Sequence, residues 1–106
     1  MLDKLTSADF MPALHQNFQL YVGPWGQPHD PAAHGAPRSV ELIEVASLVP
    51  SAPQSRSFSL IFREAARTYL PQRIYTLEHD AVGRLDLFLV PLGPDGVGMR
   101  YQAIFN

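Results

Sequence analysis

Six short segments in which apolar and polar side chains alternate with a period of two constrain this chain more than any other feature of its sequence. Such alternation is typical of β-strands that bury one face, because successive side chains of a strand point to opposite sides. The expected strands cover residues 17–22, 39–45, 57–63, 73–79, 84–90 and 98–105.

The connections between the later strands are rich in turn-forming residues. Asp80 to Gly83 predicts a hairpin turn, and the Pro, Asp and Gly of residues 91–98 predict another. Turns this short hold no crossover helix, so the pairing should be antiparallel. The sequence therefore predicts a mainly β fold, a six-stranded antiparallel small barrel or sandwich.

The segment 39–45 changes its apolar face halfway along. Val40 and Leu42 share one face, and Ile43 and Val45 then occupy the other parity. One extra residue in an antiparallel strand produces this change, so we expect a β-bulge near Leu42.

One short N-terminal helix is expected over residues 5–15. Thr6 or Ser7 can cap it, and Asp9, three residues after Thr6, suits the positive end of the helix dipole. Pro12 fits only because it lies close to the first turn. The predicted apolar face consists of Phe10, Met11 and Leu14. We expect the helix to plug an end of the barrel or to cover one of its faces.

The composition fits a single domain over residues 1–106. The 106 residues, 46% of them hydrophobic and 17% charged, can build one core without metal or disulfide support. The absence of cysteine excludes disulfides and thiolate chemistry. A net charge of −2 argues against a nucleic-acid partner. No apolar run suits a membrane span, and no secretory signal is recognisable. We expect a cytoplasmic protein with no cofactor.

The stretch 23–38 has no periodicity and holds four of the ten prolines and three of the seven glycines. It also contains Trp25, His29, Asp30 and His34. The two imidazoles and the carboxylate are ligand types for a divalent metal, but the surrounding Gly and Pro do not fix their geometry, so we assign no metal site. A surface loop is the simplest interpretation, and a binding loop anchored by Trp25 is the other.

Five apolar residues alternate away from the expected core, namely Ile61, Ile74, Phe88, Val90 and Ile104. Together they can form a contact patch on the outer face. Either the helix covers this patch or another protein chain does, for example a second copy in a two-fold homodimer. We take all of them except Ile74, together with Trp25, as candidate partner-binding residues.

No motif typical of an active site occurs in the chain. There is no nucleophile elbow, no phosphate-binding glycine loop and no spaced carboxylate pair. Glu78 and His79 are neighbours in an expected strand, so they point to opposite faces and cannot form a base with its orienting partner. We therefore assign no catalytic residue and do not expect an enzyme.

The C-terminal half carries a distinctive set of motifs. They are LPQ at 70–72, YTLEH at 75–79, LFLVPLGP at 87–94 and GMRYQAIFN at 98–106. This ending resembles a small uncharacterised bacterial family, a domain of unknown function, and the segments 5–10 and 40–45 resemble it more loosely. The resemblance implies small stand-alone proteins, some encoded near phage-tail-collar-like proteins, and hence an accessory of a tail-like or surface assembly.

Two classes of function remain open on these grounds. An aromatic-rich β domain without a catalytic constellation favours a non-catalytic interaction or assembly module, whose partner is another protein or itself. The alternative is a small-molecule-binding or enzymatic small barrel, because barrels can open a pocket at one end. The bulky side chains expected inside leave little interior space, which favours the first class.

Overall fold

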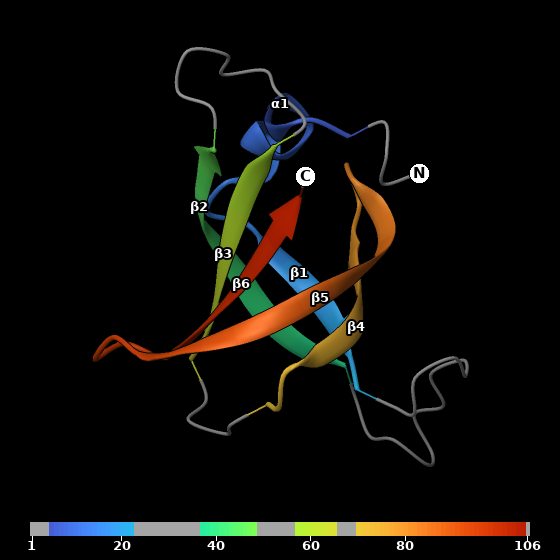
Figure 1. Ribbon diagram of the computed structural model, residues 1–106. Coiled ribbons are helices and arrows are strands. Elements are labelled where there is room, and N and C mark those ends of the chain that lie inside the picture. The colour runs from blue at the N-terminus through green and yellow to red at the C-terminus, as the bar shows by residue number, and fades with distance from the viewer. Residues whose placement is uncertain (1–4, 23–36, 49–56, 66–69, 106) are drawn as a thin grey trace.

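The computed structural model describes residues 5–22, 37–48, 57–65 and 70–105. These residues form a closed barrel of six antiparallel strands, with a short helix at one end (Figure 1). The strands follow one another around the barrel as β1-β2-β3-β6-β5-β4. Their bounds are β1 Asn17–Tyr21, β2 Arg38–Ser47, β3 Phe58–Glu64, β4 Arg73–His79, β5 Gly83–Pro94 and β6 Met99–Phe105. The predicted fold class is confirmed, and of the two predicted architectures the barrel is the one observed.

The predicted bulge lies in β2. Its register against β3 shifts between Leu42 and Glu44. At the same place the chain that leaves the helix docks on β2: His15 N–H donates to the Leu42 carbonyl at 2.7 Å, and Leu42 N–H donates to the Gln16 carbonyl at 3.0 Å. His15 has a φ of 68°, a conformation uncommon for a residue with a Cβ. The bulge therefore joins the helical segment to the barrel wall.

The helical segment is shorter than the predicted 5–15. Helix α1 spans Ser7–Phe10, and the 3-10 turn η2 spans Met11–Ala13. The predicted cap is present, since Thr6 N–H donates to Asp9 Oδ2 at 2.7 Å. Pro12 has no N–H to continue the helical hydrogen bonds. The chain accordingly tightens into the 3-10 turn and becomes extended at Leu14.

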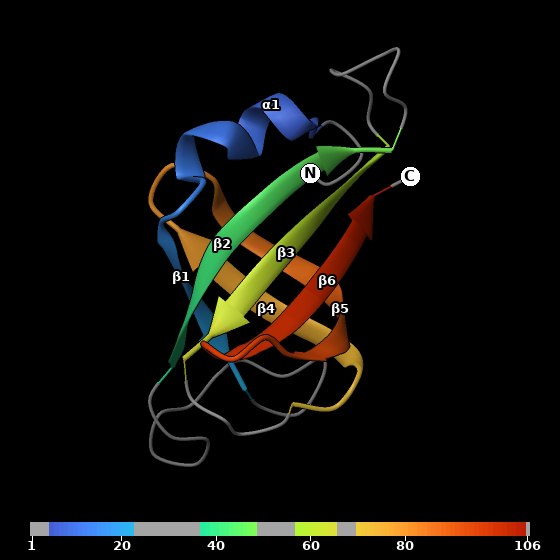
Figure 2. The same ribbon diagram turned by 90° about the vertical axis from the view of Figure 1, so that its left-hand side faces the viewer.

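The predicted apolar face of the helix is correct for Phe10 and wrong for Met11. Phe10 and Ala13 are buried, Leu14 is half-buried against the core, and Met11 is 50% exposed. The Phe10 ring lies 5.7 Å from Phe58 and 5.6 Å from Phe105. Figure 2 shows the helix lying across one end of the barrel. The helix therefore plugs an end.

The interior of the barrel is filled by side chains from all six strands. The fully buried ones are mostly aromatic or Leu, and the largest from the strands are Tyr75, Tyr101, Phe18, Phe58 and Phe62, which Phe10 joins from the helix. Phe18 and Phe62 meet edge to face, with their ring centroids 5.2 Å apart. Such contacts add to the free energy gained by burying the rings.

Strand β5 is longer than the predicted 84–90, because it continues to Pro94. Its register against β6 shifts between Pro91 and Gly93, and such an irregularity lets a strand accept proline, which cannot donate to a ladder. The turn into β6 is consequently confined to Asp95–Gly98. Asp95 Oδ1 holds it by accepting the N–H groups of Val97 and Gly98, both at 2.9 Å.

Gly98 closes this turn against the end of β3. A Cβ at this position would lie 2.2 Å from the Glu64 carbonyl oxygen, which belongs to the backbone. Gly98→Ala should therefore destabilise the protein by about 2–3 kcal/mol in urea unfolding. The matched control is Gly96→Ala in the same turn, where a Cβ meets nothing within 4 Å but φ is +89°. This control should cost about 1 kcal/mol, and equal losses in the two variants would contradict the prediction.

Candidate functional site

An ion pair occupies the interior of the barrel at the end opposite the helix. Arg38 begins β2 and Glu64 ends β3. Arg38 Nε and Nη2 donate to the two Glu64 carboxylate oxygens, each at 2.5 Å. The Glu64 side chain is 5% exposed and that of Arg38 is 23% exposed. The hydrogen bond to Glu64 raises the pKa of Arg38 above its usual value. A carboxylate held in this fork is a poor candidate for a general base.

This pair was not predicted from the sequence, although the strand period contained a signal for it. Arg38 lies two residues before the buried Val40, and Glu64 lies two residues after the buried Phe62. Both charged side chains are therefore in phase with the inward-facing apolar ones. The partnership itself joins positions 26 residues apart and depends on the closed barrel.

Two buried tyrosines face the same end of the interior. The Tyr75 hydroxyl donates to the Pro71 carbonyl at 2.5 Å, and the Tyr101 hydroxyl accepts the Leu70 N–H at 3.0 Å. Coulombic interaction with both phenols also helps to raise the pKa of Arg38. They tie the segment before β4 to the barrel, so we assign them a structural role.

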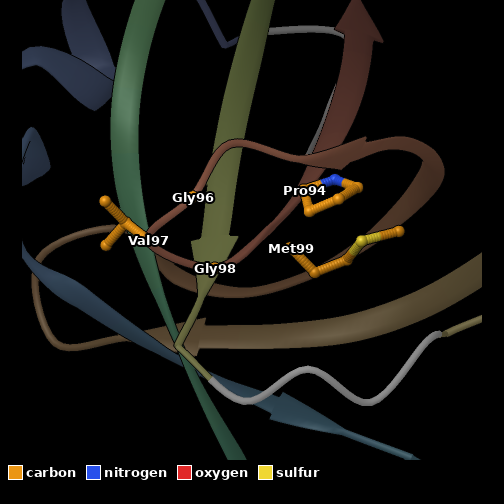
Figure 3. A pocket seen from close by; sticks show the side chains of 5 residues that line it. All are labelled: Pro94, Gly96, Val97, Gly98 and Met99. Atoms are coloured by element: carbon orange, nitrogen blue, oxygen red, sulfur yellow. The ribbon is translucent and has the colours of Figure 1, made fainter.

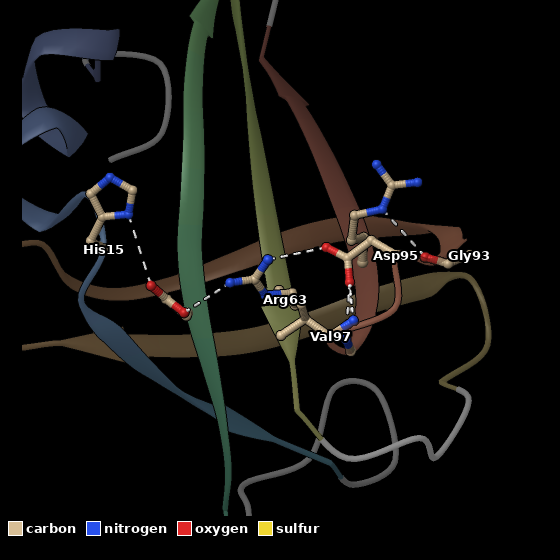
Figure 4. Close-up of polar contacts among 8 residues, drawn as sticks. His15, Arg63, Gly93, Asp95 and Val97 are labelled. Carbon is tan, nitrogen blue, oxygen red and sulfur yellow. Dashed lines mark hydrogen bonds and ion pairs between the residues drawn. The ribbon is translucent and has the colours of Figure 1, made fainter.

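A chain of charged side chains crosses the outside of β2 and β3 (Figure 4). Glu41 lies 3.8 Å from His15 Nδ1 and 3.6 Å from Arg63 Nη2, and Arg63 Nη1 donates to Asp95 Oδ2 at 3.1 Å. Hydrogen bonds from the Gly98 and Val97 N–H groups, helped by Arg63, lower the pKa of Asp95 to about 2. The described residues contain no group of three or more His, Asp or Glu side chains that suits a metal ion. These interactions stabilise the outer face of β2 and β3 and the turn at Asp95–Gly98.

His79 and Glu78 point to opposite sides of β4, as predicted. His79 Nδ1 accepts the Ala81 N–H at 3.0 Å, and its Nε2 lies 2.7 Å from Gln16 Oε1, which assigns the proton to Nε2. Glu78 instead accepts the Tyr21 hydroxyl at 2.7 Å, and this bond raises the pKa of Tyr21. Since both ring nitrogens have partners, His79 acts as a structural residue that joins β4 to the end of the helical segment.

A pocket of about 370 Å³ lies beside the β5–β6 turn (Figure 3). The described residues that line it are Pro94, Gly96, Val97, Gly98 and Met99. Its walls are mostly backbone and apolar side chain, and none of these residues carries an ionisable group. The pocket has the size of a small-ligand site, but its described lining residues do not supply the convergent polar side chains that fix a substrate.

The predicted outer patch divides into exposed and half-buried members. Phe88 is 50% and Ile104 is 55% exposed, whereas Ile61, Ile74 and Val90 are half-buried. Phe88 lies opposite Ile74 in the β4–β5 register. The helix sits at the barrel end and leaves Phe88 and Ile104 exposed, so the helix does not cover the patch. The binding role of these residues stays a prediction.

The remaining predicted site residues, Trp25, His29, Asp30 and His34, lie outside the described residues. Their interpretation as a surface loop, a binding anchor or metal ligands therefore stays a prediction from the sequence.

The fold and these surfaces define a small antiparallel β-barrel with a filled interior, plugged by a helix at one end and by an ion pair at the other. The chain belongs to the family described as Domain of unknown function (DUF6916), whose model matches residues 5–105. No curated protein and no solved structure matches it. None of the helices in the described ranges has the length and apolar character that crossing a bilayer requires.

Removing one member of the buried ion pair should cost more than removing both. Arg38→Met or Glu64→Leu alone leaves a charge without its partner, so each should lose about 3 kcal/mol in urea unfolding. The double variant should recover most of that loss. Arg63→Met, on the exposed chain of charges, serves as the control and should change stability by about 1 kcal/mol or less. A double variant as unstable as the sum of the single variants would contradict this account.

The lowered pKa of Asp95 predicts a pH dependence of stability. Its carboxylate is favoured in the folded state, where its pKa is about 2 against an ordinary value of 3.8. The resulting stabilisation is complete above the higher value and is lost as pH falls toward the lower one. Thermal unfolding of the wild type and of Asp95→Asn should therefore converge between about pH 4 and pH 2. A difference in Tm that stays constant across this window would refute the assignment.

Proposed function

We propose that this domain is a non-catalytic protein–protein interaction module. The observation that carries the proposal is the exposure of Phe88 and Ile104, two large apolar side chains on neighbouring strands of the barrel wall. Burying such side chains against a partner removes apolar surface from water and gains roughly 25 cal/mol per Å². Exposed apolar groups of this kind are typical of contact surfaces.

The filled interior supports the same proposal. Leu60, Leu77 and Leu89 are fully buried and belong to the same core cluster as the buried rings. The two charged groups inside the barrel neutralise each other, and the tyrosine hydroxyls bind backbone groups. The interior groups that could act on a substrate are therefore already engaged, which leaves the outer surface for function.

We extend the proposal to an accessory role in a tail-like or surface protein assembly, in line with the resemblance of the C-terminal motifs. The cytoplasmic location expected from the sequence is kept as part of the proposal. A small-molecule-binding barrel is the second candidate, and the pocket beside Met99 is the observation that favours it.

Phe88→Arg should abolish partner binding without unfolding the barrel, because residue 88 points outward and the new guanidinium can stay in water. Met11→Arg is the matched control, since Met11 has the same 50% exposure and lies in the 3-10 turn η2, away from the strands. We expect the wild type and Met11→Arg to retain the same protein from a host extract or to self-associate equally in light scattering. Phe88→Arg should lose that association at an unchanged Tm.

The opposite outcome is equally definite. If Phe88→Arg retains the partner as the wild type does, the outer patch with Phe88 and Ile104 is not the contact surface. If instead Val97→Arg, which introduces a charge into the pocket, removes a bound small molecule, the second candidate function is favoured.

A further inference from the structure

The seam between β5 and β6 is only partly paired. Strand β5 pairs with β4 from Gly83 to Leu89, but its pairing with β6 begins at Val90, which lies opposite Gln102. In Figure 1 the two strands diverge from their connecting turn. On the side of β5 that faces β6, residues 84–89 thus have no strand partner among the described residues. Main-chain donors and acceptors on a free edge are a template for another strand.

The side chains along this free edge have a specific pattern. Phe88 is exposed, and so is Ile104 on the facing strand. Asp86 accepts the Thr76 hydroxyl at 2.7 Å, and among the described residues it has no ion pair. Arg84 already lies 3.6 Å from Glu78. The edge therefore presents an apolar position and, two residues earlier on the same face, a carboxylate that pairs with no cation of the described ranges.

We propose that the free edge of β5 binds an extended segment of another protein by antiparallel strand addition. The segment carries an apolar residue opposite Phe88 and a Lys or Arg opposite Asp86. Main-chain hydrogen bonds supply affinity in this mode of recognition, and alternate side chains supply specificity. The inference rests on the proposed function and specifies the chemistry of its partner.

A second copy of the chain is a poorer match to this edge. Two-fold pairing of β5 with itself can place Phe88 opposite Arg84, Asp86, Phe88 or Val90. The same registers place Asp86 opposite Asp86, Phe88, Val90 or Leu92, respectively. None of these four registers supplies a cation to Asp86, and one opposes two carboxylates, which is destabilising across strands. The next register places Arg84 of the second copy opposite Asp86, but that arginine already lies 3.6 Å from Glu78, and Phe88 would then lie opposite Val82, outside the strand. The charge pattern thus favours a different protein over a homodimer.

A synthetic peptide tests the proposal directly. In acetyl-VITKTE-amide, the Ile, Lys and Glu would lie opposite Phe88, Asp86 and Arg84 in an antiparallel ladder. We expect it to slow amide hydrogen exchange at residues 84–89 by about tenfold or more at saturation. Replacing its Lys by Glu should weaken binding about fivefold. The Asp86→Lys variant should reverse this preference between the two peptides.

Two versions of the peptide, N-methylated at alternate residues in opposite phase, separate strand pairing from side-chain contact. At least one of them should lose binding, because the backbone N–H groups that bond to a neighbouring strand come from alternate residues. If both bind as the parent does, or if the parent gives no protection in β5, strand addition is overturned. Protection that appears without peptide as protein concentration rises would identify a second copy as the occupant and also overturn the proposal. The capture result with Phe88→Arg is independent of these outcomes, so the proposed function is tested separately.

Discussion

The inward side chains of six strands share a narrow cylinder, and this packing constraint shapes the rest of the molecule. A small barrel has space inside only for the residues that its own strands direct there. Here Phe18 and Phe62 meet inside the barrel, and the hydroxyls of Tyr75 and Tyr101 bind backbone groups of Pro71 and Leu70. Because these side chains fill the cylinder, the fold leaves only its two ends and its outer wall for contact with other molecules.

The two openings are closed by different physical means. At one end the rings of Phe10, Phe58 and Phe105 pack on one another, and Phe58 and Phe105 are stacked with centroids 4.4 Å apart. At the other end the strand period directs Arg38 and Glu64 inward. Burying two charges is costly unless each satisfies the other, and the two-bonded fork provides that satisfaction. The ion pair therefore makes a charged end compatible with an otherwise apolar interior.

The strand period predicted six antiparallel strands in a barrel or a sandwich, because one rule, burial of every second residue, applies to all six strands. The bulge at Leu42 was predictable for the same reason, since it appears as a change of parity. The length of the helix was not, because Pro12 and the docking of His15 on β2 decide it together. Strand β5 exceeded its prediction because an irregular register allows prolines that normally end a strand. The Arg38–Glu64 contact was not predictable, because the strand period shows which residues face inward but not which of them meet once the barrel closes.

The ring contact between Phe10 and Phe105 has a consequence for how the domain is attached to anything else. It brings the beginning and the end of the described chain to one pole of the barrel, 5.6 Å apart at these rings. A polypeptide fused to either end of the described chain would therefore leave the barrel from the same pole. The opposite pole, with its buried charges, would face away from the tether.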